Sequence, residues 1–185
     1  ARRTMAIAQQ LYEGVNTGGE GSEGLITYMR TDSTNVAATA LSEANRYIKE
    51  KFGPNYAPAK PRVFSRKSKG AQEAHEAIRP TSIYRDPASV RPHLTSEQFR
   101  LYDLIWKRML ASQMSDALLD MTTIDIEASG TDSGKVYEFR VTGSVLKFPG
   151  FRRLYLEGRD DAAKGDDDDE ATLPNLNEGE ALRPL

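Results

Sequence analysis

Apolar residues recur every three or four positions over three stretches of residues 1–114, which predicts three amphipathic helices. The first helix covers residues 3–13. The second starts near residues 32–35, which are rich in capping side chains, and ends at Gly53-Pro54. The third follows the capping box Thr95-Ser-Glu-Gln98 and covers about residues 96–114. The apolar stripes are Met5, Ala8, Leu11 and Tyr12; Leu41, Ala44, Ile48 and Phe52; and Leu101, Leu104, Ile105 and Met109, widened by Trp106 and Leu110.

From residue 119 the apolar period changes to two, which is typical of strands with one buried face. We expect a first strand over residues 123–128, a turn at 130–134, a second strand, and a third after Phe148-Pro-Gly-Phe151. The chain is therefore expected to be α+β, with a mainly helical domain over residues 1–114 and a β-rich segment over 115–185. The residues expected on the apolar face are Ile124, Ile126, Ala128, Tyr137, Phe139, Val141, Leu154 and Leu156.

The stretch between the first two helices contains the most distinctive chemistry. Residues 14–24 form a glycine-rich loop, and residues 26–31 are expected to be extended. In an extended segment Tyr28 and Arg30 point the same way. A phenol beside a fixed cation is suited to attack on a phosphodiester, because the cation favours the phenolate and stabilises growing negative charge. The alternative is a tyrosine that packs in the core with its hydroxyl satisfied.

Two further segments carry candidate site residues. Residues 71–78 are expected to form a short helix stopped by Pro80, with His75 and Arg79 on one face. Residues 54–69 form an irregular basic loop that includes Arg62 and Lys67. This loop is either a solvated charge run or a contact to a DNA backbone.

Composition limits the remaining possibilities. The chain has no cysteine and two histidines, so a zinc site of thiolates is excluded. Residues 1–113 carry 17 Lys and Arg against 11 Asp and Glu, whereas residues 114–185 carry 8 against 16. Residues 160–170 include seven acids, which we interpret as a solvated loop because their spacing does not fit a calcium site. The sequence has no apolar run long enough to span a membrane and no signal peptide, so we expect a cytoplasmic protein without a membrane partner.

Four sequence blocks resemble the bacterial type IA DNA topoisomerases of the topoisomerase I subgroup. They occur in the family order and cover about residues 3–114, while residues 115–185 match only loosely. The blocks are Leu25–Ser33, which resembles the active-site tyrosine segment; Ala71-Gln-Glu-Ala-His-Glu-Ala-Ile-Arg-Pro-Thr81, which resembles the histidine segment; Arg3–Gly14; and Leu101–Arg108.

The resemblance implies that Tyr28 attacks a backbone phosphate of single-stranded DNA and becomes linked to the 5′ side of the break. The free 3′ hydroxyl later reseals the strand, so negative supercoils relax without ATP. Arg30 is then the cation on the scissile phosphate and His75 its hydrogen-bond donor, and Asp32 is expected to hold Arg30 through an ion pair. The residues expected near the DNA are Asp32, Ser33, Thr34, Arg62, Lys67 and Arg79.

In this family Mg²⁺ is held by acids of an N-terminal Toprim domain, and no such acidic pattern occurs in this sequence. The resemblance therefore implies that the metal binds outside this chain. We interpret the chain as a fragment cut at both ends, with its strands belonging to an incomplete arch domain. We expect the fragment alone to be inactive and the parent enzyme to be associated with the nucleoid.

Two other functions remain open. A helical domain of this size could be a non-catalytic DNA-binding module, which needs no reactive tyrosine. A tyrosine recombinase or type IB enzyme gathers basic residues before a late tyrosine. Here Tyr28 precedes His75 and most arginines, which disfavours that class.

Overall fold

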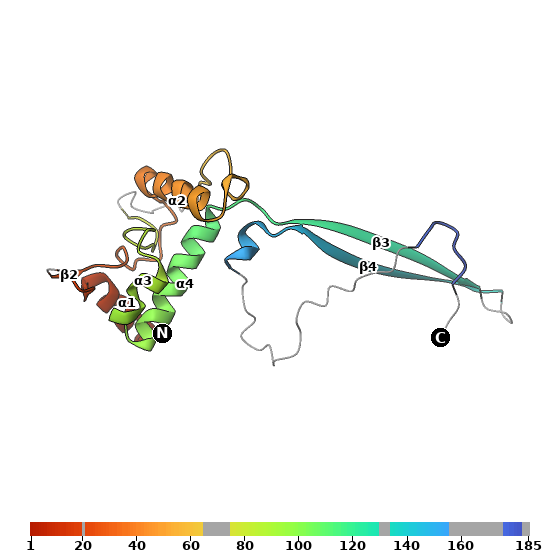
Figure 1. Cartoon of the computed structure of the whole chain (residues 1–185). Coiled ribbons are helices and arrows are strands. Elements are labelled where there is room, and N and C mark those ends of the chain that lie inside the picture. The colour runs from red at the N-terminus through yellow and green to blue at the C-terminus, as the bar shows by residue number, and fades with distance from the viewer. Residues whose placement is uncertain (20, 65–74, 130–133, 156–175, 183–185) are drawn as a thin grey trace. The chain divides into compact units, whose positions relative to one another are not determined.

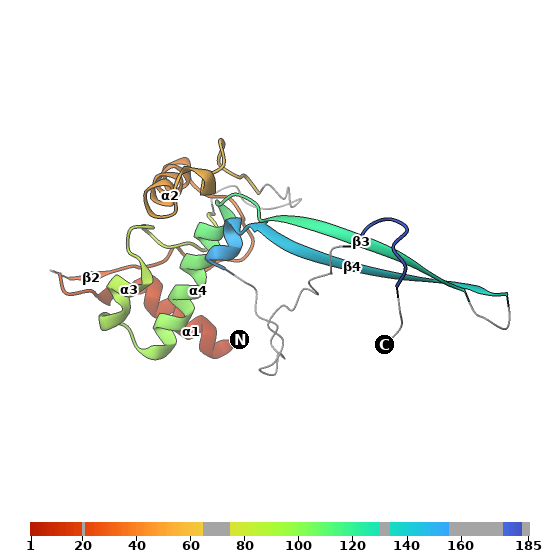
Figure 2. The same ribbon diagram turned by 45° about the vertical axis from the view of Figure 1, so that its right-hand side comes forward.

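The computed structural model describes residues 1–19, 21–64, 75–129, 134–155 and 176–182 (Figures 1 and 2). The chain divides into two compact units, the first formed by residues 1–116 with the segment that begins at Gly150, and the second containing Ala117–Pro149. Within the described residues there are four α-helices and two small antiparallel sheets, which confirms the α+β class.

The first unit is built around its longest helix. The helices are α1 (Arg2–Glu13), α2 (Ala38–Lys51), α3 (Pro87–Val90) and α4 (Ser96–Ser112), and α1 and α3 pack against α4 (Figure 1). The described residues also form three 3₁₀ turns: η1 (Pro54–Tyr56) after α2, η2 (Arg91–His93) between α3 and α4, and η3 (Gly150–Arg153) after the second unit's hairpin. The largest fully buried side chains among the described residues are Leu11, Leu25, Ile26, Ile48, Tyr102, Leu110 and Met114.

Helix α4 confirms the predicted capping box. Thr95 Oγ1 accepts from the Gln98 backbone N–H at 3.3 Å, and Gln98 Oε1 accepts from the Thr95 backbone N–H at 2.9 Å. Leu104 was expected in the buried apolar stripe of this helix, and that expectation is wrong because Leu104 is 44% exposed. Tyr102 is fully buried instead, and its hydroxyl is satisfied by donating to the Arg85 carbonyl at 2.6 Å. Trp106 is a core residue as predicted, and its Nε1 donates to the Ile83 carbonyl at 2.9 Å.

Two expected boundaries before α2 are wrong. The glycine-rich loop contains a small hairpin, in which β1 (Val15–Asn16) pairs with β2 (Ser22–Glu23). Helix α2 begins at Ala38, not near residues 32–35, and no side chain caps it. Ser33 Oγ accepts from the Asn35 backbone N–H at 3.1 Å, so this capping residue stabilises a local turn ahead of the helix.

The expected strand at residues 26–31 and the expected helix at 71–78 are also wrong where the structure describes them. Only Ile26 pairs, in an isolated bridge with Pro80. Residues 75–78 are not helical, and residues 71–74 lie outside the described part. The chain around each segment instead bonds to the other: Thr27 donates its backbone N–H to the Arg79 carbonyl, and Ala77 donates its N–H to the Asn35 carbonyl. These long-range bonds compete with a local helix.

The second unit contains a hairpin of β3 (Leu118–Ser129) and β4 (Val136–Phe148). Ile124 pairs with Val141 and Ile126 pairs with Phe139, so the predicted apolar residues share one face of the hairpin. The expectation that this face is buried is wrong at Tyr137 and Phe139, which are 52% and 58% exposed. The expected third strand is wrong at Leu154, because the chain turns into η3 after Gly150, which has a φ of +48°. Leu156 and the acidic stretch at 160–170 lie outside the described residues.

Candidate active site

The tyrosine segment is anchored on both sides of Tyr28. Thr27 donates its backbone N–H to the Arg79 carbonyl at 2.9 Å and its hydroxyl to the Ala77 carbonyl at 2.8 Å. On the other side, Met29 is buried in the core. Tyr28 itself is 53% exposed, so a fixed backbone presents an accessible phenol. The alternative that Tyr28 is a core residue is therefore wrong.

The Tyr28 ring rests against α1. It meets the Tyr12 ring edge to face, with centroids 5.2 Å apart. Gly24 lets the backbone of this segment approach α1 closely, because a Cβ at that position would lie 2.6 Å from the Tyr12 carbonyl oxygen. The segment is further tied to α1 by the Leu25 backbone N–H, which donates to the Leu11 carbonyl at 2.8 Å.

Arg30, Asp32 and His75 form one cluster beside this segment. Arg30 Nη1 lies 2.8 Å from His75 Nε2, and Arg30 Nε lies 3.5 Å from Asp32 Oδ2. His75 Nδ1 is 3.8 Å from the same carboxylate oxygen. The expected ion pair between Arg30 and Asp32 is therefore present. The cluster joins residues 45 positions apart in sequence, and its guanidinium is about half exposed.

The local backbone differs from the extended segment expected around the tyrosine. The Arg30 N–H donates to the Tyr28 carbonyl at 2.9 Å, which closes a tight three-residue turn. Tyr28 and Arg30 are therefore close neighbours through this turn, not through strand alternation.

The other expected DNA contacts are scattered. Arg79 is mostly buried and bonds Glu76 Oε2 at 2.6 Å, and Arg62 bonds Asp116 Oδ2 at 2.8 Å. Through that hydrogen bond Arg62 lowers the pKa of the Asp116 carboxyl. Thr34 donates its hydroxyl to the Phe64 carbonyl. Lys67 lies outside the described residues, and roles in DNA binding for the others, including Ser33, stay predictions.

Sequence reasoning missed the residues that support the site. These residues are Tyr12, Gly24 and Thr27. Their contacts depend on partners far along the chain, and a pattern of local spacing carries no signal for them.

Among the described residues, no group of three or more His, Asp or Glu side chains is placed to hold a metal ion. Nor does any helix in the described part of the chain have the length and apolar character needed to cross a membrane.

Comparison with known proteins agrees with the sequence blocks. The profile of a family described as DNA topoisomerase matches residues 1–185. The chain belongs to the bacterial DNA topoisomerase family. It is 50% identical over 179 residues to DNA topoisomerase 1 from two strains of Xylella fastidiosa, Temecula1 and 9a5c, which covers 97% of this chain and 21% of each relative. The chain thus spans about a fifth of the length of these topoisomerases.

A solved structure supports the same family. Full-length topoisomerase I from Thermotoga maritima matches with a TM-score of 0.68 at 40% sequence identity, over 88% of this chain and 24% of that one. The resemblance to topoisomerase I that the sequence suggested is therefore confirmed, and the topoisomerase fold accounts for both units.

Proposed function

We propose that this chain carries the strand-cleaving centre of a type IA DNA topoisomerase, with Tyr28 as the nucleophile. The Tyr28 oxygen attacks a backbone phosphorus of single-stranded DNA, and the bond from phosphorus to the 3′ oxygen breaks. The phenol loses its proton, and the departing 3′ oxygen gains one. The DNA is then held by a 5′ phosphotyrosine ester, which conserves the energy of the broken bond, so that resealing needs no ATP.

One observation carries this proposal: Arg30 and His75, from two distant sequence blocks, meet beside an anchored and exposed tyrosine. A guanidinium can bind two phosphate oxygens at once and stabilise the charge that grows during attack. His75 supplies a second hydrogen bond to the same phosphate. Asp32 orients Arg30 through the ion pair, which makes it a positioning residue.

No step of this mechanism is assigned to a metal on this chain, since the described residues hold no suitable ligand group. We propose instead that Mg²⁺ and a Toprim domain act from the rest of the protein. The expected substrates are single-stranded and negatively supercoiled DNA, and the expected location is the cytoplasmic nucleoid.

Tyr28→Phe tests the proposal in the full-length protein. This change keeps the ring that packs on Tyr12 and removes the hydroxyl. Covalent adducts with single-stranded DNA and relaxation of supercoiled plasmid should both fall to background, while circular dichroism is unchanged. An adduct that survives the substitution would refute the assignment. A protein that binds DNA but never forms an adduct would favour the non-catalytic DNA-binding module.

A further inference from the structure

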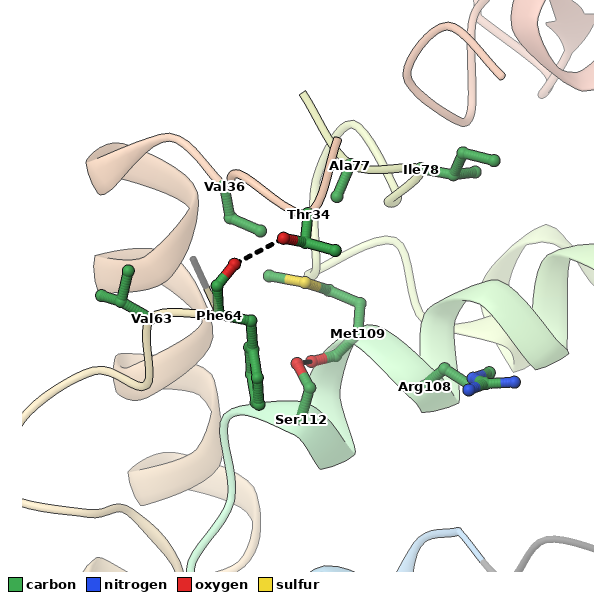
Figure 3. Close-up of a pocket in the computed structure, with 9 residues that line it drawn as sticks. All are labelled: Thr34, Val36, Val63, Phe64, Ala77, Ile78, Arg108, Met109 and Ser112. Carbon is green, nitrogen blue, oxygen red and sulfur yellow. Dashed lines mark hydrogen bonds between the residues drawn. The ribbon is translucent and has the colours of Figure 1, made fainter. Parts of the chain in front are cut away.

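A largely apolar pocket of about 690 Å³ lies in the first unit. Figure 3 shows Phe64 and Met109 facing this space, with Thr34 at its edge and Ser112 on α4. The volume falls within the range of ordinary ligand pockets, about 300–1,000 Å³. The Phe64 side chain is 50% exposed, whereas Met109 is buried and forms part of the core.

The pocket wall is continuous with the catalytic cluster. Thr34 follows Asp32 by two residues and Ala77 follows His75 by two, and both line the pocket. The two segments are joined where the Ala77 N–H donates to the Asn35 carbonyl at 2.7 Å. Two residues of chain span at most about 7 Å, so the pocket begins within reach of a nucleotide whose phosphate is held by Arg30 and His75.

The segment that carries Phe64, the aromatic wall of the pocket, is held in place before any ligand binds. Thr34 donates its hydroxyl to the Phe64 carbonyl. Arg62, two residues before Phe64, is held by the buried side chain of Gln113. The Gln113 Oε1 accepts from the Arg62 backbone N–H at 3.1 Å, and its Nε2 donates to the Arg62 carbonyl at 3.2 Å. A preorganised wall loses less entropy when a ligand packs on it.

We propose that this pocket receives one unstacked base of the DNA strand, from a nucleotide next to the phosphate held by Arg30 and His75. Phe64 offers the ring on which the base stacks, and the Met109 thioether contacts an aromatic edge. Because every base has an aromatic face, this contact tolerates any sequence. The inference rests on the proposed function, since it places the held phosphate beside the pocket.

Binding to abasic oligonucleotides tests the inference separately from cleavage. The full-length protein carrying Tyr28→Phe is titrated with single-stranded oligonucleotides that contain a cleavage site and one abasic nucleotide, moved through each position in turn. One position next to the scissile phosphate should weaken binding by about 5- to 150-fold. Adding Phe64→Leu, which keeps an apolar side chain but removes the ring, should abolish the penalty at that position. Phe64→Tyr should restore it.

Phe139→Ala is the matched control, because Phe139 is also exposed but lies on β4, in the second unit. With this variant, the abasic nucleotide at the sensitive position should still weaken binding. The inference is overturned if no position near the break is sensitive, or if the penalty is the same with Phe64→Leu. It is also overturned if Phe64→Leu lowers thermal stability without changing the abasic profile, since the pocket then packs against protein. Failure of the Tyr28 assignment would appear in adduct formation, which this binding assay does not measure.

Discussion

Arg30 Nη1 lies 2.8 Å from His75 Nε2, and the chemistry of the two groups fixes which one donates. A guanidinium has no acceptor, so His75 Nε2 must accept, and the hydrogen of the neutral ring then sits on Nδ1. Nδ1 faces Asp32 Oδ2 at 3.8 Å, a separation that exceeds hydrogen-bond length. Arg30 and His75 are thus held together before DNA binds. A phosphate that replaces their mutual contact accepts a hydrogen bond from Arg30, and it can accept one from His75 Nε2 only after the ring hydrogen has moved from Nδ1 to Nε2.

This relationship predicts that Arg30 and His75 act as a unit in cleavage. Arg30→Ala or His75→Ala should each slow adduct formation about 100- to 1,000-fold in the full-length protein, the cost of losing about 2.7–4 kcal/mol of charge stabilisation. The double variant should lose less than the product of the two effects, because both residues act on one phosphate. Single-turnover cleavage of a labelled oligonucleotide measures these rates.

Arg30→Lys separates charge from geometry. The lysine keeps the positive charge but cannot form the planar fork, so this variant should still cleave more slowly than the wild type. A cleavage rate equal to wild type would show that charge alone is required. A wild-type rate in either alanine variant would remove that residue from the site.

Gly24→Ala should loosen the contact between α1 and the tyrosine segment. The added Cβ would lie 2.6 Å from the Tyr12 carbonyl oxygen, which is backbone and must move. We expect a loss of about 1–3 kcal/mol in the free energy of unfolding, measured by urea titration, together with slower cleavage. Gly19→Ala is the control, since a Cβ there meets nothing within 4 Å and should change neither quantity. If the two variants have the same free energy of unfolding and the same cleavage rate, Gly24 is not closely packed against the Tyr12 carbonyl.

Tyr102 should contribute to unfolding at alkaline pH. Burial raises the pKa of Tyr102 above its ordinary value near 10, so the neutral phenol stabilises the fold below about pH 10 and this contribution is lost as pH rises further. Tyr102→Phe should cost about 1 kcal/mol at pH 8, where the hydrogen bond to Arg85 is lost. Its stability should then fall less steeply above pH 10.

Urea titrations between pH 8 and about pH 11 measure this slope. The slope should shrink without vanishing, because burial also raises the pKa of Tyr47. Tyr137→Phe, at an exposed position on β4, should leave the slope unchanged. A slope that is the same in Tyr102→Phe and wild type would refute the role of Tyr102.

The sequence predicted elements whose stability is local. The capping box at Thr95 and Gln98 and the alternation of the β3–β4 hairpin depend on neighbours a few residues apart, and both were found. The turn at Tyr28 could not be predicted, because Thr27 bonds Ala77 and Arg79, about 50 residues away. For the same reason the capping side chains at 33–35 gave a false helix start, since tertiary pairing with Ala77 holds Asn35 outside the helix.

When the 185-residue chain is expressed alone, its first unit should fold. The chain should bind single-stranded DNA weakly and should not relax supercoiled DNA. The basic excess of residues 1–113 supports DNA binding that weakens steeply with salt. Relaxation should fail because the metal ligands are expected outside this chain. Incubation with Mg²⁺ and negatively supercoiled plasmid, followed by gel electrophoresis, measures relaxation. A ladder of relaxed products that disappears with Tyr28→Phe would show that the chain needs no other domain.

The attachment site of DNA tests the central claim most directly. The covalent adduct of the full-length protein with a short oligonucleotide is digested with a protease that cleaves after glutamate, because cleavage at Glu13 and Glu23 separates Tyr12 from Tyr28. Mass spectrometry should find the nucleotide on the peptide that contains Tyr28, and Tyr12→Phe should leave the adduct in place. A nucleotide on the Tyr12 peptide, or on any other tyrosine, would contradict the account.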